Sequence, residues 1–294
     1  MYLETPCQLS FPLTTFTPTE VRQQIKMLNP QKAPGYDLIT GELLQKLPRK
    51  AVALLTVIYN SILRLRYFPI QWKLAQVTMI PKPGKPATQA NSYRPISLLP
   101  IMSKVLERLL LHKIEQVVPI NEIIPQHQFG FRREHSTIQQ CHRIVIIIKT
   151  TLEEKKFRAG VFLDIQQAFD RVWQQVLLCK LKLHLTDQLY FILKSYLTDR
   201  YFQVKIEDNF SNYHIIQSGV PQGSVLGPFL YRIFTADVPT RNDTFLATFA
   251  DDTGILLVDV DPNVASQKVQ NHLDQLQNWL KRWKINVNAS KSYK

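Results

Sequence analysis

The chain has 294 residues, of which 45% are hydrophobic, and it carries a formal net charge of +13 with a pI near 9.6. This length allows one large hydrophobic core or two smaller ones, and the 18 prolines argue against a long helical rod. No signal peptide is visible, and the most apolar run, Ile144–Ile148, is far too short to span a bilayer, so we expect an intracellular protein that does not cross a membrane.

The positive charge is concentrated in the first half of the chain. Residues 1–160 hold 22 Lys and Arg against 10 Asp and Glu, whereas residues 161–294 hold 14 against 13. The first part therefore suggests a surface for a polyanion such as a nucleic acid, and the second part carries most of the carboxylates. Ordinary surface lysines that serve solubility are the alternative. The three cysteines show no CxxC spacing, which indicates reduced thiols and neither a disulfide framework nor a zinc site.

The first half of the chain is predicted to be mostly helical. Apolar residues at Val21, Ile25 and Leu28 have helical spacing and follow a Thr-Pro-Thr-Glu start. In chain order we expect helices over 18–28 and 41–66, a strand over 76–80, a long basic loop over 81–95, a helix from 97 to about 118, and a helix over 136–150 with an apolar face through Ile138, Cys141, Val145 and Ile148.

The second half combines strands with helices. We expect a buried strand over 158–165 that ends at Asp164, a helix to about 183, a hairpin over 200–217 that turns at 207–209, a helix that ends near 234, two short strands around Asp251-Asp252, and a last helix with Asp261 as N-cap and Pro262 at its first position. The sum is an α+β fold: a small antiparallel sheet backed by helices, preceded by a basic part.

Three aspartates stand at the predicted strand ends. Asp164 ends one apolar strand, and Asp251 and Asp252 lie at a tight turn between two others. If these strands are neighbours in one sheet, the carboxylates meet at one end of it and need cations to neutralise them. Oxygen ligands suit Mg²⁺ or Mn²⁺, and two such ions can stabilise both the attacking and the leaving oxygen in phosphoryl transfer.

The aspartates also have a purely structural interpretation. Asp164 could cap a helix and Asp251-Asp252 could form a turn, because aspartate favours both positions for backbone reasons. Adjacent residues of a strand point to opposite faces, so the members of the pair are not equivalent unless the turn re-aims one of them. Asp251 is therefore the preferred direct ligand, and Asp252 is the less certain partner.

Seven segments occur in an order and spacing that are far more specific than any one of them alone. The chain resembles the reverse transcriptase domain of non-LTR (jockey-like) retrotransposons from about Phe16 to its end. The segments are IPKPGK (80–85), NSYRPISLL (91–99), QFGFRREHST (128–137), LDIQQAFDRVW (163–173), SGVPQGSVLGP (218–228), FADD (249–252) and RWKINVNASKS (282–292).

The resemblance implies a right-hand polymerase composed of fingers and palm. It implies an N-terminal helical extension of the fingers over 1–75, basic fingers over 76–157 and a palm over 158–294. It further implies RNA-templated DNA synthesis that is primed from nicked target DNA, with two Mg²⁺ or Mn²⁺ ions, deoxynucleoside triphosphates, an RNA template and a DNA primer as cofactors and partners. Action in the nucleus is implied in the same way.

The resemblance also assigns roles to single residues. Asp164, Asp251 and Asp252 match the catalytic aspartates, and the Ile165 carbonyl matches a backbone ligand of the metal. Lys291 matches a candidate proton donor to pyrophosphate.

Further matches concern the incoming nucleotide. Phe169 matches the steric gate that excludes a 2′-hydroxyl, with packing of the following helix as the alternative. Gln222 and Gly223 match the loop that lines the nucleotide pocket, because glycine lets backbone approach a ligand closely. Arg94, with Lys82 or Lys85, matches the contacts to the triphosphate, for which a guanidinium fork is well suited. Which of the two lysines takes part is open.

The resemblance stops short at both ends of the chain. Relatives of this kind continue into a thumb and usually begin with an endonuclease, and neither is recognisable here. We therefore expect fingers and palm with the thumb absent. The alternative function is an inactive RNA-binding remnant, which would bind RNA in a salt-sensitive way without incorporating nucleotides.

Overall fold

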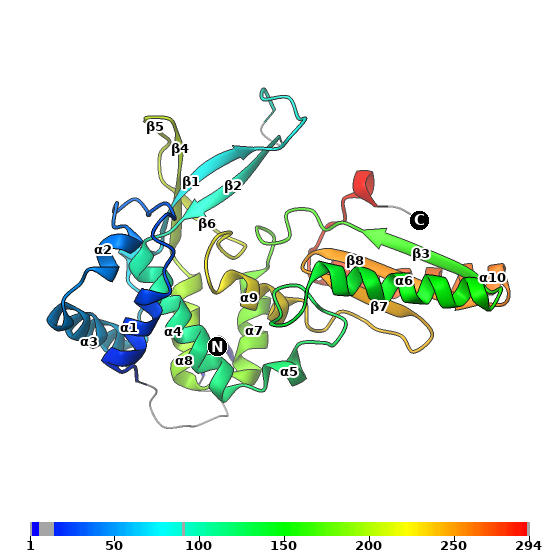
Figure 1. Ribbon diagram of the computed structural model, residues 1–294, viewed down its shortest axis with the longest axis horizontal. Helices are drawn as coiled ribbons and strands as arrows, with labels where there is room; N and C mark the ends of the chain where they lie inside the picture. The colour runs from blue at the N-terminus through cyan, green and yellow to red at the C-terminus, as the bar shows by residue number, and fades with distance from the viewer. Residues whose placement is uncertain (1, 6–14, 90–91, 293–294) are drawn as a thin grey trace. The chain divides into compact units, whose positions relative to one another are not determined.

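The computed structural model describes residues 2–5, 15–89 and 92–292, and it divides into two compact units. The first unit comprises Met1–Pro119 and Leu177–Gly227, and the second comprises Ile120–Val176 and Pro228–Lys294. Each unit contains its own small sheet together with helices (Figure 1). This mixture confirms the predicted α+β class. The division into extension, fingers and palm at residues 76 and 158 stays a prediction.

The sheet of the first unit is mixed. Its strands are ordered β2-β1-β4-β5, with β6 also paired to β4. β1 pairs antiparallel with β2 and parallel with β4, and the predicted hairpin over 200–217 is present with its turn at Glu207 and Asp208. The strands are β1 (Leu74–Pro81), β2 (Tyr93–Leu98), β4 (Arg200–Ile206), β5 (Asn209–Phe210) and β6 (His214–Ile216).

Helices supply most of the core of the first unit. Contacts join α1 to α2, α3 and α4, and α3 to α8. The helices are η1 (Tyr2–Glu4), α1 (Pro18–Lys26), α2 (Gly41–Gln45), α3 (Arg49–Leu65), η2 (Ile70–Trp72), α4 (Ile101–Val117), α7 (Gln174–His184), which begins three residues before the unit does, and α8 (Asp187–Leu197).

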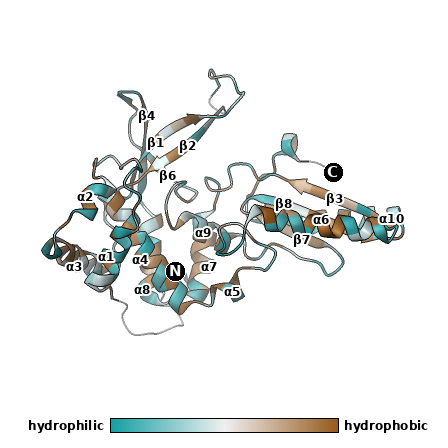
Figure 2. Ribbon diagram, viewed as in Figure 1, coloured by the Kyte–Doolittle hydropathy of each residue, from teal (hydrophilic) through white to brown (hydrophobic). Residues whose placement is uncertain are grey.

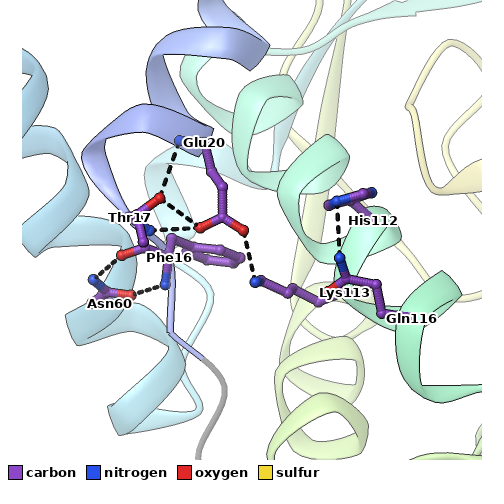
Figure 3. Close-up of polar contacts among 7 residues, drawn as sticks. All are labelled: Phe16, Thr17, Glu20, Asn60, His112, Lys113 and Gln116. Carbon is purple, nitrogen blue, oxygen red and sulfur yellow. Dashed lines mark hydrogen bonds and ion pairs between the residues drawn. The ribbon is translucent and has the colours of Figure 1, made fainter.

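Helix α1 is fixed to its neighbours by polar contacts at its N-terminus (Figure 3). Thr17 and Glu20 form a capping box, which satisfies backbone N–H groups that the first helical turn leaves unpaired. Glu20 also pairs with Lys113 of α4 at 2.7 Å. The side-chain amide of Asn60 in α3 accepts from the N–H of Phe16 and donates to its carbonyl. These contacts confirm the predicted helix start and join it to two other helices.

The second unit is a three-stranded antiparallel sheet in the order β3-β8-β7 (Figure 1). Helix α10 packs on β3 and β8, and Val161, Leu257, Ala265 and Val269 form the core between them. Asp261 caps α10 by accepting from the N–H of Asn263, as predicted. The elements are α5 (Ile120–Ile123), α6 (Thr137–Glu153), β3 (Phe157–Leu163), α9 (Gly227–Phe234, whose first residue closes the first unit), β7 (Phe245–Phe249), β8 (Asp252–Asp259), α10 (Pro262–Arg282) and η4 (Ala289–Lys291).

The single helix predicted over 41–66 is wrong. The structure has two helices there, α2 and α3, separated at Pro48. Proline lacks a backbone N–H and disfavours helical conformation in the residue before it. The helix that begins at Gly41 therefore ends before Pro48, and Pro48 directly precedes the first residue of α3.

The predicted loop over 81–95 is confirmed for residues 82–89 but was placed to end too late, and the predicted helix start at residue 97 is wrong. Residues 93–98 form β2, and α4 begins only at Ile101. Pro95 argued against a strand at this place. However, β2 lies at the edge of its sheet, where a missing N–H is tolerated, and Pro95 pairs there with Met79.

The apolar face predicted for residues 136–150 does not face the core. Ile138 is 79% exposed, and the residues that α6 buries are Gln140 and Thr151. The Gln140 amide donates to the carbonyls of His127 and Thr248, which turns a polar face of the helix toward β7. The central apolar run of α6 is visible in Figure 2.

Helix α8 was not expected from the sequence. Seven of its eleven residues are buried, and its apolar residues gather on one broad face, so the periodicity of a helix is present in this segment of the sequence. Among the described residues, no helix is both long and apolar enough to cross a bilayer. Cys7 lies outside the described residues, and Cys141 and Cys179 are exposed free thiols.

Candidate active site

The sheet of the second unit brings the three predicted aspartates to one end. Leu163 of β3 pairs with Thr253 of β8, and this is the last pair between the two strands. Asp164 and Asp252 each lie one residue beyond it, at the same end of the sheet. Phe249 of β7 pairs with Asp252, which leaves only Ala250 and Asp251 in the connecting turn. The expectation that these strands are neighbours in one sheet is thus confirmed.

The turn makes the two adjacent aspartates different. Ala250 has a φ of 57°, in the left-handed region that residues with a Cβ rarely adopt. Asp251 lies within the turn and is half-buried, whereas Asp252 begins β8 and is exposed. The two aspartates therefore differ, as expected, but the turn and not strand alternation makes them different.

The electrostatics of this end of the sheet favour a cation. Burial raises the pKa of Asp251, and the charges of Asp252 and Asp164 raise it further. Burial, followed by the charge of Asp164, also raises the pKa of Asp252. Lys291 opposes both effects, and its Nζ lies 3.4 Å from Asp164 Oδ2. The predicted proton donor Lys291 thus lies beside the carboxylates and supplies positive charge there.

Asn288 is a residue of this site that the sequence analysis missed. Its side-chain amide donates to Asp164 Oδ2 over 2.9 Å, and its backbone N–H donates to the Asp164 carbonyl over 2.8 Å. Ile165 forms an isolated antiparallel bridge with Val287. The hydrogen bonds of this bridge are made by the flanking residues, so the pairing itself does not use the Ile165 carbonyl that was predicted to bind metal.

The residues present fit a hard divalent cation in their chemistry. Carboxylate oxygens and a backbone carbonyl are the ligands that Mg²⁺ and Mn²⁺ prefer, and burial together with neighbouring negative charge raises the pKa values of Asp251 and Asp252, which a bound cation would oppose. Within the described residues, no three Asp, Glu, His or Cys side chains converge closely enough to hold one ion. The three aspartates thus lie at one end of the sheet, but their side chains do not converge on a single position.

Phe169 lies in an aromatic cluster close to the aspartates. Its ring stacks on Tyr231 with centroids 5.0 Å apart and meets Phe131 edge-on at 5.9 Å. Burial raises the pKa of Tyr231, and the charges of Asp251 and Asp252 raise it further. Tyr231 is therefore near both the Phe169 ring and the carboxylates.

The residues predicted to bind the triphosphate belong to the first unit. Arg94 is exposed on β2, opposite Ile80 of β1, and the Lys82 N–H donates to the Ser92 carbonyl over 2.8 Å. Lys85 is exposed in the loop of the same hairpin, directly after Gly84. The structure thus places all three predicted cations on one β-hairpin.

The predicted pocket loop is attached to that hairpin. The N–H of Ser97 in β2 donates to the Gln222 carbonyl over 3.0 Å. Gly223 has a φ of 104°, and a Cβ on it would lie 2.8 Å from the Ser97 carbonyl oxygen. Only glycine fits this close approach, so Gln222 and Gly223 are held beside the strand that carries Arg94.

Glu107 is a second residue that the sequence analysis missed. It is fully buried in α4 and accepts hydrogen bonds from the N–H groups of Val225 and Leu226, which follow the pocket loop. Burial raises the pKa of its carboxyl. Val225 and Leu226 are separated from Glu107 by 118 and 119 positions in the sequence, so no local pattern could have revealed these contacts.

Carboxylates that meet at one end of a sheet can bind divalent cations, and such ions can stabilise the attacking and leaving oxygens of a phosphoryl transfer. The profile of one family, described as reverse transcriptase (RNA-dependent DNA polymerase), matches residues 80–294. The chain therefore belongs to the reverse transcriptase family. Members of this family generally use divalent metal ions.

Curated relatives confirm the jockey-like resemblance. The probable RNA-directed DNA polymerase from transposon BS of Drosophila melanogaster is 44% identical over 99% of this chain and 33% of its own length. The RNA-directed DNA polymerase from mobile element jockey of the same species is 43% identical over 99% of this chain and 32% of its own. The chain thus spans about a third of the length of these relatives.

Solved structures confirm the fold of the family. Apo telomerase from Candida tropicalis, truncated from its C-terminal domain, matches with a TM-score of 0.54 at 15% identity, over 88% of this chain and 57% of that one. Telomerase from Candida albicans, in complex with a fragment of telomeric RNA, matches with a TM-score of 0.52 at 15% identity, over 82% and 46%. At this identity the likeness concerns the fold alone.

Proposed function

We propose that this chain catalyses RNA-templated DNA synthesis as the polymerase domain of a jockey-like non-LTR element. The observation that supports this most is the meeting of Asp164 with Asp251 and Asp252 at one end of the sheet in a chain of the reverse transcriptase family. In the reaction, the 3′-oxygen of a DNA primer attacks the α-phosphorus of a deoxynucleoside triphosphate. The 3′-hydroxyl gives up its proton to solvent, a new P–O bond forms, the bond to the bridging oxygen of the β-phosphate breaks, and pyrophosphate leaves.

The acidic residues would hold two divalent ions. Asp164 and Asp251 are the main ligands, and Asp252 and the Ile165 carbonyl assist. When bound, such ions increase the acidity of the primer hydroxyl and neutralise charge on the phosphates. Lys291 stands beside Asp164 and can donate a proton to the leaving pyrophosphate.

The other predicted residues would select and orient the nucleotide. Phe169 closes the space that a 2′-hydroxyl would need. Arg94, with one of the hairpin lysines, neutralises the triphosphate, and Gln222 positions the base or sugar from a loop that Gly223 keeps close to β2. RNA template, DNA primer and deoxynucleotides are thus the proposed partners. Action in the nucleus follows only from the resemblance and stays a prediction.

A primer-extension assay tests the proposal. The chain is given an RNA template, an annealed DNA primer, deoxynucleotides and Mg²⁺, and wild type is compared with Asp251→Asn. We expect extension by wild type and its loss in the variant. Asp259→Asn is the matched control, because Asp259 lies at the far end of β8, the strand that follows Asp251, and pairs there with Lys268.

Equal extension by wild type and Asp251→Asn would contradict the assignment of the metal site. The alternative of a non-catalytic RNA-binding chain is less well supported, because Asp164, Asp251 and Asp252 lie at one end of one sheet. Salt-sensitive RNA binding without incorporation in either Mg²⁺ or Mn²⁺ would favour that alternative.

A further inference from the structure

The turn that carries Asp251 contains a backbone conformation that needs support. Ala250 has a φ of 57°, where its Cβ is crowded by its own backbone. Such residues persist only when their surroundings fix them, and they tend to occur where function depends on a defined geometry. The position of the Asp251 carboxylate depends on this residue, because the two form the whole of the loop between β7 and β8.

The side chain of Gln128 brackets Ala250 from both sides. Gln128 Oε1 accepts from the Ala250 N–H over 3.0 Å, and Gln128 Nε2 donates to the Ala250 carbonyl over 3.2 Å. The same Oε1 also accepts from the Gly130 N–H over 2.8 Å. Gln128 is only 5% exposed, so water does not compete effectively for these groups.

The backbone around Gln128 is itself firmly attached to β7. The N–H of Phe129 donates to the Thr248 carbonyl over 2.9 Å, and the N–H of Thr248 donates to the His127 carbonyl over 3.0 Å. The buried amide of Gln140 donates to both of these carbonyls. Residues 127–129 therefore behave as a short additional strand that presents the Gln128 side chain to the turn.

Gly130 allows this segment to approach the turn. A Cβ at this position would lie 2.0 Å from the Ala250 nitrogen, a distance at which real atoms cannot coexist. The glycine of the QFGFR segment is therefore required by close packing against the turn that bears Asp251. The segment and the FADD turn form one structural assembly, although 122 positions separate Gln128 from Ala250.

We propose that Gln128 is a positioning residue for the polymerase reaction. Its amide holds Ala250 in the left-handed conformation, and the Asp251 carboxylate is thereby kept where it can bind metal and face the primer terminus. In this role Gln128 acts through Ala250 and not by contact with substrate or metal. This inference rests on the proposed function, since it assigns a purpose to the geometry of the same site.

The test compares three variants of the chain. Gln128→Met removes both amide contacts with little change in volume. Gln140→Met is the comparison variant, because Gln140 is an equally buried glutamine on α6 that supports the backbone of residues 127–129 and makes no hydrogen bond to Ala250. Gln128→Met combined with Ala250→Gly is the rescue, because glycine adopts a positive φ without a Cβ clash.

Two measurements are independent of catalysis. Hydrogen exchange of the peptide that contains Ala250 should be faster in Gln128→Met, because the Ala250 N–H loses its acceptor. Mn²⁺ affinity measured by calorimetry should fall by about 10- to 100-fold, as is usual when the support of a metal ligand is removed. Gln140→Met should change both less than Gln128→Met does, because the Ala250 N–H keeps its acceptor, and the rescue should restore Mn²⁺ affinity.

In primer extension, Gln128→Met should lower kcat by about 10- to 100-fold with little change in the KM for deoxynucleotide. The inference would be overturned if Gln128→Met showed the hydrogen-exchange rate and the Mn²⁺ affinity of wild type. It would also be overturned if Gln140→Met lost as much Mn²⁺ affinity as Gln128→Met. If Gln128→Met does not fold, Gln128→Asn, whose amide is too short to bracket Ala250, takes its place. A wild type that extends no primer would defeat the proposed function, whereas exchange and metal binding would still decide the role of Gln128.

Discussion

Asn288 holds Asp164 by two hydrogen bonds, one from its side-chain amide to Oδ2 and one from its backbone N–H to the carbonyl. The first bond orients the carboxylate, and the second fixes the chain at the point where β3 ends. The Asp164 carboxylate therefore receives an amide from Asn288 and a positive charge from Lys291. An orienting contact of this kind is characteristic of carboxylates that bind metal.

We expect Asn288→Ala to weaken Mg²⁺ binding or lower kcat by about 10- to 100-fold, because the carboxylate loses its orienting donor while the backbone bond remains. Asn286→Ala is the matched control, since Asn286 lies two residues earlier with an exposed side chain. Primer extension as a function of Mg²⁺ concentration measures the effect. Equal losses in the two variants would show that the segment, and not the Asn288 side chain, is what matters.

The hairpin geometry distinguishes the two candidate lysines. Ile80 pairs with Arg94, and Lys82 follows Ile80 by two residues, so the alternation of a strand carries Lys82 to the face that holds Arg94. Lys85 lies beyond Gly84, whose φ is 72°, in the connecting loop. We therefore expect Lys82, and not Lys85, to act together with Arg94 on the triphosphate.

The expected result is a rise in the KM for deoxynucleotide of about 10- to 100-fold in Lys82→Ala, which corresponds to a charge-assisted hydrogen bond. Lys85→Ala should remain close to wild type, and Arg94→Lys should show a partial loss because the guanidinium fork is removed while the charge stays. Steady-state primer extension at varied nucleotide concentration gives these values. A larger effect of Lys85→Ala would reverse the assignment.

The sequence was informative where short-range patterns decide the structure. Apolar residues on both sides of Asp251-Asp252 and an apolar run before Asp164 were sufficient to predict the strands of the second sheet, and helix-capping residues predicted α1 and α10. The ordered motifs then identified the family. The strand β2 was missed because Pro95 is tolerated only at an edge, and the edge position depends on the partner strand.

The supporting residues of the site could not be predicted for a related reason. Gln128, Asn288 and Glu107 each act on residues more than 100 positions away along the chain. A polar residue in a helix or loop has no local signature that distinguishes such a role from exposure to solvent. Gln140 illustrates this, because the expected apolar face of α6 proved exposed while this glutamine was buried.

Phe169 should control the choice of sugar. Its ring stacks on Tyr231, which is itself close enough to Asp251 and Asp252 to feel their charges. This stacking holds the Phe169 ring near the aspartates. We expect Phe169→Val to reduce discrimination against ribonucleotides by about 10- to 100-fold, because a small side chain leaves room for a 2′-hydroxyl. Incorporation of ribo- and deoxynucleotides by the same preparation provides the ratio. Phe131→Val removes the neighbouring ring and should leave this ratio nearly unchanged. If wild type incorporated ribonucleotides and deoxynucleotides equally well, the role of Phe169 as a steric gate would be refuted.

The stability of the second unit should depend on pH through His127. Burial lowers the pKa of His127 from 6.5 to about 4, with smaller contributions from Arg143 and His272. The folded chain thus favours the neutral imidazole, whereas the unfolded chain binds a proton near pH 6.5. The stabilisation is fully present above pH 6.5 and is lost as the pH falls toward 4.

We therefore expect the free energy of unfolding to decrease over this window by roughly 1.4 kcal/mol per pH unit at most, as far as this group alone contributes. His127→Leu should remove this component, because no proton can be taken up at the position, while His142→Leu, on an exposed residue of α6, should retain it. Denaturant unfolding at several pH values, followed by a probe in the second unit, measures the slope. Identical slopes for wild type and His127→Leu would assign the acid sensitivity to other groups.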